Sequence, residues 1–280
     1  MSLVSTEQLA EQIGAGDLAI VDASYHLPET GRDAAAEYAA GHLSGAVFLD
    51  LATLVDPASP IDNTMPPADI FARRMESLGI GDDSRIVLYD DSAIKSAARA
   101  WYMLKAFGAR HVAVLDGGLA KWKAEGRPLV SDTPPPPPAS FTARPDPARL
   151  RSKADMLTNV ETPREQVVDA RGPGRFTGED RETREGIESG HIPGSRNVHY
   201  ARLFETDGTF RNARELREIF AASGVDLARP VVTTCGSGMT ACTLAFALHL
   251  AGKDDVALYD GSWAEWGADP RTPKAAGPAE

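Results

Sequence analysis

The sequence predicts an α/β fold that is built twice, each half a mostly parallel sheet flanked by helices. Short apolar runs alternate with helical patterns, which is typical of parallel sheets joined by crossover helices. Motifs of the first half also recur in the second: 20–23 at 167–170, 41–45 at 190–194, 85–90 at 230–235 and 115–122 at 259–266. By subtraction, the offsets lie between 144 and 149 residues. Four ordered matches at a nearly constant offset predict a duplicated domain.

The first half has a clear order of elements. Aliphatic and β-branched runs predict strands at 18–21, 46–49, 86–89 and 112–115. Between them, helical patterns predict helices at 6–13, 34–40, 68–78 and 96–107. In such a sheet, ligands bind beyond the carboxyl ends of the strands.

The halves are joined by a proline-rich stretch. Five consecutive prolines at 134–138 predict an extended polyproline segment, a semi-rigid spacer that packs little core itself. We therefore expect a non-catalytic first domain at 1–132, a linker at 133–150 and a catalytic second domain at 151–280.

The stretch 230–252 carries the most chemistry. Residues 231–234 are β-branched and predict a buried strand. Residues 241–251 are apolar good helix formers, and Gly252 is a suitable C-terminal stop. The loop 235–240 between them contains Cys235, two glycines and Ser237.

This loop makes Cys235 a candidate nucleophile. Glycines allow backbone N–H groups to point inward, and the following helix adds its positive end. A thiol held there is expected to be partly thiolate at neutral pH, which is the attacking form. The alternative is a buried structural cysteine, which is the interpretation we favour for Cys242. In the first half the equivalent position is Asp90, which can cap a helix but cannot act as a sulfur nucleophile.

Composition excludes several classes of function. The chain has 29 Lys and Arg against 40 Asp and Glu, a net charge of −11, which argues against nucleic acid or an anionic membrane as partner. Two cysteines form no disulfide framework, and neither a signal peptide nor a membrane-spanning run is recognisable, so we expect the cytoplasm. Without a Cys/His cluster or a Walker lysine, we expect no metal and no cofactor.

Taken together, the motifs resemble the rhodanese superfamily of two-domain sulfurtransferases over nearly the full length. They are 31–33 with 41–46, 168–171 with 174–176, 190–194, the Cys235 loop and 260–263. Within the superfamily, Cys235-Gly236-Ser237-Gly238 resembles the 3-mercaptopyruvate branch, whereas the thiosulfate branch typically has basic residues after the cysteine. Met239 stands where a valine is common.

The resemblance implies a set of substrate-binding residues. Arg175 and Arg184 match the arginines that hold the substrate's carboxylate and keto oxygens, a task that suits guanidinium groups. The loop residues Gly236, Gly238, Met239 and Thr240 would cradle the sulfur with their N–H groups. Two alternatives remain for Arg184: Arg181 could take its role, or it could pair on a solvated loop with the acidic residues Glu179, Asp180, Glu182 and Glu185.

The resemblance also implies a relay. Ser237 matches a serine linked to a histidine and an aspartate of the first domain, by position His42 and Asp33. Such a relay would polarise the hydroxyl as in hydrolase triads. The alternative is a structural role, because the Gly-His motif recurs at His191.

The implied reaction moves sulfur from 3-mercaptopyruvate to a persulfide on Cys235, releasing pyruvate. A thiol acceptor, such as thioredoxin or a small thiol, or cyanide then takes the sulfur, and we expect a monomer. A thiosulfate sulfurtransferase, a phosphatase-like enzyme and a non-catalytic sulfur-binding module are the alternatives. The phosphatase is opposed by Ala241, which stands where a phosphate-clamping Arg is expected.

Overall fold

A computed structural model describes residues 2–132, 135–182 and 184–279. The chain forms two compact units, each with a short segment from the other half of the sequence. Unit 1 contains Met1–Pro57, Met65–Asp146 and Glu205–Phe210; unit 2 contains Ala58–Thr64, Pro147–Phe204 and Arg211–Glu280. The chain passes from unit 1 to unit 2 between Asp146 and Pro147, inside the predicted linker 133–150.

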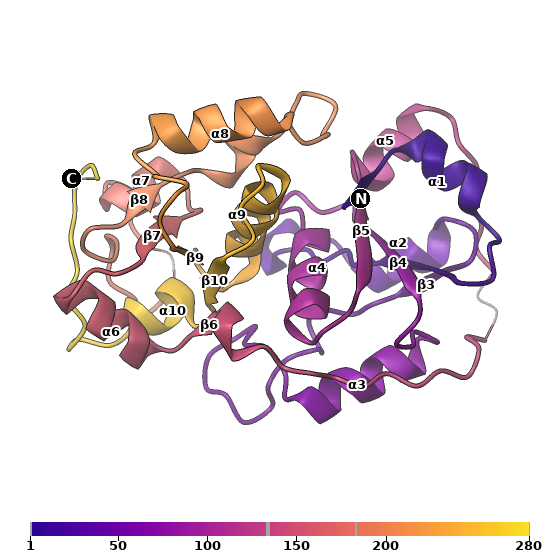
Figure 1. Cartoon of the computed structure of the whole chain (residues 1–280), viewed down its shortest axis with the longest axis horizontal. Coiled ribbons are helices and arrows are strands. Elements are labelled where there is room, and N and C mark those ends of the chain that lie inside the picture. Colours follow the sequence, from indigo (N-terminus) through magenta and orange to yellow (C-terminus); the bar gives the residue numbers. More distant parts are fainter. Residues whose placement is uncertain (1, 133–134, 183, 280) are drawn as a thin grey trace. The chain divides into compact units, whose positions relative to one another are not determined.

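Unit 1 is built on a five-stranded sheet of order β1-β5-β4-β2-β3, with every strand pair parallel. Strands β3, β4 and β5 of this sheet are labelled in Figure 1. The strands are β1 Leu3–Val4, β2 Leu18–Asp22, β3 Ala46–Phe48, β4 Arg85–Tyr89 and β5 His111–Leu115. The helices are α1 Thr6–Gln12, α2 Ala34–Ala40, α3 Ala68–Ser77, α4 Ala97–Ala106 and α5 Gly118–Ala124, with a 3-10 turn at Pro28–Thr30. All eight predicted elements are present, with ends that differ by no more than one residue; β1 and α5 were not predicted.

Unit 2 repeats this architecture with a sheet of order β6-β10-β9-β7-β8, again all parallel. Its strands are β6 Leu150–Arg151, β7 Gln166–Asp169, β8 Arg196–Asn197, β9 Val231–Thr234 and β10 Val256–Tyr259. Its helices are α6 Lys153–Glu161, α7 Pro173–Thr177, α8 Ala213–Ala222, α9 Met239–Leu250 and α10 Ser262–Trp266, with 3-10 turns at Pro147–Arg149 and Tyr200–Leu203. The equal strand order confirms the predicted fold class of two tandem α/β domains.

The core of unit 2 explains why the end of β9 is a rigid support. On one face of the sheet, α6 and α10 pack against the strands through Met156, Trp263 and Trp266. Helix α9 packs against β9 and β10, and α8 packs on α9. Every residue of α9 from 241 to 248 is buried, as the predicted all-round apolar pattern requires. Strand β9 is paired with β10 on one side and β7 on the other, so the loop that follows it leaves from the interior of the sheet.

The proline-rich segment differs from the expected bare spacer, although Thr133 and Pro134 lie outside the described residues. Phe141 is buried in unit 1, with its ring edge-on to Phe71 at 5.7 Å between centroids. The backbone N–H and hydroxyl of Thr142 both donate to the Asp82 carboxylate, at 2.9 Å each. The segment therefore contributes to the core of unit 1, because an aromatic residue follows the prolines.

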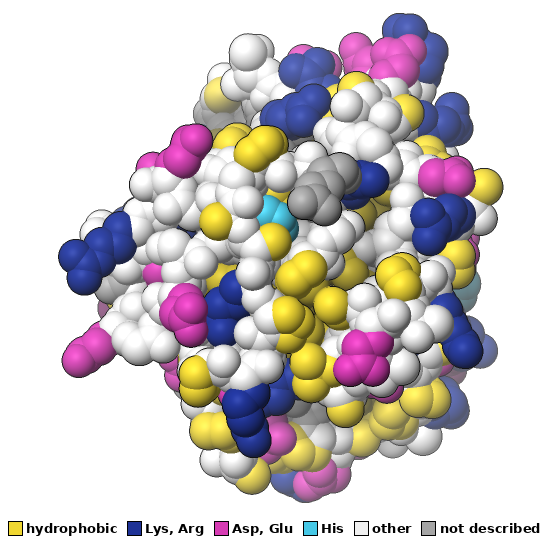
Figure 2. Space-filling view, turned by 90° about the vertical axis from the view of Figure 1, so that its left-hand side faces the viewer, with side chains coloured by type: hydrophobic (Ala, Val, Ile, Leu, Met, Phe, Trp, Pro, Cys, Tyr) yellow, Lys and Arg dark blue, Asp and Glu magenta, His cyan; other side chains and the backbone are white. Residues whose placement is uncertain are grey.

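Among the described residues, no helix has the length and apolar character that crossing a membrane requires. On the face shown in Figure 2, acidic and basic side chains are interspersed around a central group of hydrophobic ones. Neither sign of charge covers that face continuously.

Candidate active site

Cys235 is the first residue after the central strand β9, at the carboxyl edge of the unit 2 sheet. Its side chain is almost completely buried, with the residue 1% exposed. The start of α10 fixes the backbone on either side of it. Trp263 N–H donates to the Cys235 carbonyl and Ala264 N–H to the Gly236 carbonyl, both at 2.9 Å. Two elements distant in sequence thus converge on the predicted nucleophile.

The helix after the loop begins earlier than predicted, at Met239 instead of Ala241. Gly238 caps it with φ of 77°, a left-handed conformation that glycine adopts without strain. Met239 and Thr240 therefore form the first helical turn, where backbone N–H groups have no partner within the helix. The positive end of α9 lies four residues after Cys235 in the sequence.

Sequence reasoning missed the residue that organises the loop, Ser262. Its hydroxyl accepts hydrogen bonds from the N–H groups of Cys235 at 3.3 Å and Gly238 at 3.0 Å. It donates to the Tyr259 carbonyl at 2.9 Å, so its donor and both acceptor positions are used. Gly238 N–H, predicted as part of the sulfur cradle, is therefore engaged with Ser262.

Ser262 also has φ of 51°, an unusual conformation for a residue with a side chain. The equivalent residue of unit 1 is Gly118, with φ of 60°. A serine has thus replaced glycine at a strained position only in the half that carries the cysteine. Comparison of the two repeats could have found this residue from the sequence.

We expect Ser262→Gly to leave the fold intact but to lower kcat/KM roughly 10- to 100-fold. Glycine suits the backbone at this position, while the loss of two loop hydrogen bonds removes about 1–3 kcal/mol of positioning. Steady-state kinetics with the sulfur donor and a thermal unfolding curve measure the two effects separately. Wild-type turnover in a variant that folds normally would show that the hydroxyl does not organise the site.

The two predicted arginines converge on the residue next to Cys235. A Cβ atom placed on Gly236 would lie 3.5 Å from Arg175 Nη2 and 3.6 Å from Arg184 Nη2. Arg184 Nη2 also donates to the Gly236 carbonyl at 3.2 Å. The alternative candidate Arg181 is exposed, whereas Arg184 contacts the loop through the Gly236 carbonyl; the substrate-binding role of either arginine stays a prediction.

The arginines are bridged by Glu182, which the sequence offered only as one of several acidic neighbours. Its carboxylate accepts from Arg175 Nη2 at 2.7 Å and from Arg184 Nε at 3.4 Å. The Glu182 side chain is 3% exposed, against 40% and 38% for the two arginines. Burial acts to raise the pKa of Glu182, but the Arg175 hydrogen bond and both guanidinium charges outweigh it and lower that pKa. Two cations and one carboxylate leave this group with one net positive charge.

We expect Glu182→Gln to lower kcat/KM for a monocarboxylate donor about 10-fold, because the guanidinium groups lose the anchor that orients them. Loss of the Glu182 carboxylate also leaves the site with one more positive charge. The ratio of kcat/KM for the monocarboxylate donor to kcat/KM for a dianionic donor should therefore fall. Kinetics with both donors across pH tests this.

The pH dependence gives a second readout for Glu182. A carboxylate with a lowered pKa contributes above its ordinary pKa, and its contribution is lost as pH falls through the lowered value. Wild-type activity should therefore approach that of the Gln variant only below about pH 4.5. A wild-type profile that matches the variant at every pH would contradict the assigned role.

His42 is bonded within unit 1. The ring is fully buried, and its Nδ1 and Nε2 are hydrogen-bonded to the carbonyls of Tyr38 at 2.8 Å and Asp132 at 3.0 Å. His191 in unit 2 likewise bonds the Phe176 carbonyl through Nδ1 at 2.8 Å, and both histidines stack on the aromatic ring of the same partner. Matching contacts in both repeats favour the structural alternative, while a relay role for His42 stays a prediction.

Asp33 and Ser237, the other relay candidates, lie in different units. Asp33 is exposed and is the N-cap of α2, where its carboxylate accepts from Ala36 N–H at 3.0 Å. Ser237 is half-buried in the loop of unit 2. Their link also stays a prediction.

In unit 1 the position of Cys235 is held by Asp90, which is not the N-cap of α4, a position that Ser96 takes, but which bonds the first N–H group of that helix. Its carboxylate accepts from Ser92 N–H at 3.1 Å and Ala97 N–H at 2.6 Å, and burial raises its pKa to about 6.

Cys242 is a core residue of α9, fully buried, as predicted. Within the described residues, no group of three or more His, Cys, Asp and Glu side chains is placed to hold a metal ion.

Comparisons with known proteins agree with this picture. The family model described as "Rhodanese-like domain" matches residues 5–125 and 152–269. Human 3-mercaptopyruvate sulfurtransferase is 43% identical over 95% of this chain and 91% of its own length. Bovine thiosulfate sulfurtransferase is 42% identical with the same coverage. The crystal structure of SseA from Escherichia coli, presented with the fold and mechanism of 3-mercaptopyruvate sulfotransferases, has a TM-score of 0.86 and 36% identity over 94% of this chain and 99% of that one.

Proposed function

The chain belongs to the family of rhodanese-like domains, and on this premise we propose that it is a 3-mercaptopyruvate sulfurtransferase. The observation that carries the proposal is the convergence of Arg175 and Arg184 on Gly236, the residue after Cys235. A nucleophilic thiol beside two guanidinium groups suits a substrate that carries sulfur near a carboxylate.

Sequence identity alone does not choose the donor, because the two kinds of relative differ by a single percentage point. The charge of the site, in contrast, favours one of the two donors. The loop from Gly236 to Ala241 has no charged side chain, and Glu182 neutralises one of the two arginines. One net positive charge matches the single carboxylate of 3-mercaptopyruvate, whereas thiosulfate is a dianion.

The reaction has two steps. The Cys235 thiolate attacks the donor sulfur, the carbon–sulfur bond breaks, and its electron pair leaves on pyruvate as the enolate, which then takes a proton. The substrate's thiol hydrogen stays on the outer sulfur of the persulfide. In the second step a thiolate acceptor or cyanide attacks that outer sulfur, and Cys235 leaves as thiolate.

The other residues support these steps. N–H groups of the first turn of α9 and those of Gly236 and Ser237 stabilise the anionic sulfur, since the N–H groups of Cys235 and Gly238 are bonded to Ser262. The arginines bind the carboxylate and keto oxygen, and Glu182 orients them. Ser237 donates to the developing enolate, with or without a relay through His42 and Asp33. The acceptor we propose is thioredoxin or a small thiol, and the protein acts as a cytoplasmic monomer.

Mass spectrometry of the intact protein tests the proposal. Treatment with 3-mercaptopyruvate should add the mass of one sulfur atom, localised to Cys235 after digestion and removed by a thiol acceptor or cyanide. Addition to Cys242 instead, or no addition while pyruvate is released, would overturn the mechanism.

Thiosulfate sulfurtransferase is the second candidate, favoured by the 42% identity to the bovine enzyme. It would form the same persulfide from a different donor. A phosphatase has less support, because the position of the phosphate-clamping Arg holds the buried Ala241.

A further inference from the structure

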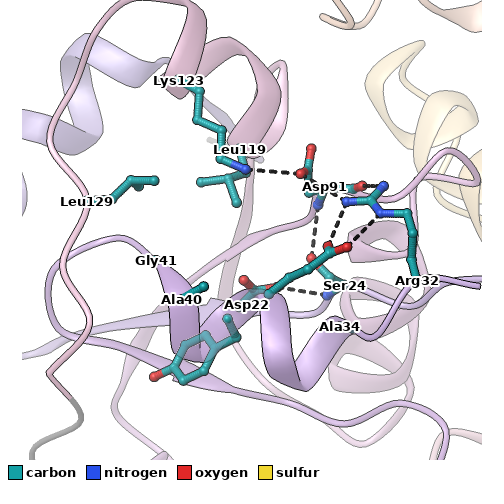
Figure 3. A pocket seen from close by; sticks show the side chains of 12 residues that line it. Asp22, Ser24, Arg32, Ala34, Ala40, Gly41, Asp91, Leu119, Lys123 and Leu129 are labelled. Atoms are coloured by element: carbon teal, nitrogen blue, oxygen red, sulfur yellow. Dashed lines mark hydrogen bonds and ion pairs between the residues drawn. The ribbon is translucent and has the colours of Figure 1, made fainter.

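Unit 1 contains a cavity of about 390 Å³ that the sulfur chemistry does not use. Its buried lining residues are Asp22 at the end of β2, Ser24 two residues beyond that strand and Leu119 of α5. Arg32 and Lys123 lie at its edge and point toward Asp91 (Figure 3). The cavity therefore has a buried carboxylate in its lining.

The equivalent place in unit 2 is filled by an arginine side chain. The Arg171 guanidinium donates to the Asp169 carboxylate at 2.7 Å through Nη2 and at 3.0 Å through Nε. Nη2 also donates to the Gly190 carbonyl at 2.7 Å, and the guanidinium lies 4.5 Å from the centroid of a Trp263 ring. Asp169 and Arg171 are 1% and 4% exposed, so this ion pair is buried, although Arg171 Nη1 is a buried nitrogen without a hydrogen-bond partner among the described residues.

The backbone turn after the aspartate is the same in both units. Asp22 corresponds to Asp169 and Ser24 to Arg171, each two residues after the aspartate. Ser24 N–H donates to Asp22 Oδ1 at 2.9 Å, and Arg171 N–H donates to Asp169 Oδ1 at the same distance. The two carboxylates are therefore held by the same local turn.

The other residues that surround Arg171 in unit 2 also have counterparts among the residues that line the cavity in unit 1. Gly41 corresponds to Gly190 and Leu119 to Trp263, and both Gly41 and Leu119 line the cavity. Tyr38, which also lines the cavity, corresponds to Phe176, because the carbonyl of each is hydrogen-bonded to Nδ1 of the buried histidine in its unit. Unit 1 thus keeps the surroundings of a guanidinium group but has serine where unit 2 has the arginine.

The electrostatics of Asp22 fit this comparison. Burial raises the pKa of its carboxyl, and the charge of Asp91 adds to the rise, against hydrogen bonds from Ser24 and Tyr89. No Lys, Arg or His within the described part of the chain forms an ion pair with Asp22. A buried carboxylate with only neutral donors is stabilised by a cation that reaches it.

We propose that this cavity of unit 1 binds a small organic monocation of the guanidinium type, whose planar group contacts Asp22 as Arg171 contacts Asp169. The proposal is independent of the sulfur donor.

The charges around the cavity specify the ligand further. Arg32 is bound to Glu37 and to Asp91, and Lys123 is bound to Asp91. Together with Asp22, the cavity therefore has three carboxylates, Asp22, Glu37 and Asp91, against the two cations. The one net negative charge that remains suits a monocation. Guanidinium is more weakly hydrated than ammonium and packs flat against apolar groups such as Leu119, so it enters this partly apolar cavity more readily.

Binding of methylguanidinium to the full chain tests the proposal, measured by calorimetry at constant ionic strength. Methylurea, a neutral molecule of nearly the same shape, is the matched control ligand. We expect saturable binding of methylguanidinium that is at least about 10-fold tighter than that of methylurea. Equal affinities, or no saturable binding of methylguanidinium, would overturn the proposal.

Two variants locate the site. Ser24→Arg supplies the side chain that unit 2 has at this position, so it should abolish methylguanidinium binding and raise the melting temperature. Asp22→Asn should weaken binding at least about 10-fold. A thermal unfolding curve identifies any variant that fails to fold, and the comparison of the two ligands on the wild-type chain then still decides. Undiminished binding in a folded Ser24→Arg variant would place the ligand elsewhere and refute the assignment.

Discussion

Cys235→Ser is expected to abolish sulfur transfer, with turnover at least about 1000-fold below wild type. Serine has nearly the shape of cysteine, but its hydroxyl is not ionised at neutral pH and cannot form a persulfide. The backbone bonds that hold the position, from Trp263 N–H to the Cys235 carbonyl and from Cys235 N–H to Ser262, do not involve the sulfur. Stability should therefore change little. Pyruvate release and the persulfide signal measure the loss.

Cys242→Ser is the matched control, because it makes the same chemical change at the other cysteine of the chain. The Cys242 sulfur lies 3.2 Å from the Gly238 carbonyl, a contact that a serine hydroxyl can keep. We expect turnover within about twofold of wild type, with a modest loss of stability from the buried hydroxyl. Substantial turnover by the Cys235 variant, or loss of activity only in the Cys242 variant, would refute the proposed nucleophile.

The fold could be predicted from the sequence because the repeats provide a check on each element. Four ordered motif matches and the alternation of apolar runs with helical patterns were enough for the parallel sheets of both units. Elements held mainly by tertiary contacts were missed. Strand β1, for example, has two residues, Leu3 and Val4, whose partners on β5 are more than a hundred residues away.

The candidate site was predicted less completely, because its organisation depends on contacts between distant residues. The nucleophile follows from a local pattern, and the two arginines from a resemblance. Glu182 and Ser262 give no local signal of their roles, since an acidic loop residue is common and the strain at Ser262 appears only in the backbone angles. The cavity beside Asp22 likewise becomes visible only when both repeats are compared in three dimensions.

Donor preference is the second large effect that the proposed function predicts. We expect kcat/KM for 3-mercaptopyruvate to exceed that for thiosulfate at least about 100-fold, or about 2.7 kcal/mol in transition-state terms. Arg175, Arg184 and Glu182 together carry one net positive charge, and the loop Gly236–Ala241 adds no other cation to receive a dianion. Kinetics with both donors under identical acceptor conditions measures the ratio. Faster turnover of thiosulfate would identify a thiosulfate sulfurtransferase instead.

The Arg184→Ala variant tests whether this arginine binds the carboxylate of the donor. Because a carboxylate clamp acts in the ground state as well as the transition state, KM for 3-mercaptopyruvate should rise about 10-fold or more, while thiosulfate turnover changes much less. Arg181→Ala is the matched control, since Arg181 is an exposed arginine three positions earlier in the same loop, and it should leave both donors unaffected. Equal losses with both donors in Arg184→Ala would mean that its bond to the Gly236 carbonyl supports the loop and that the donor carboxylate is bound elsewhere.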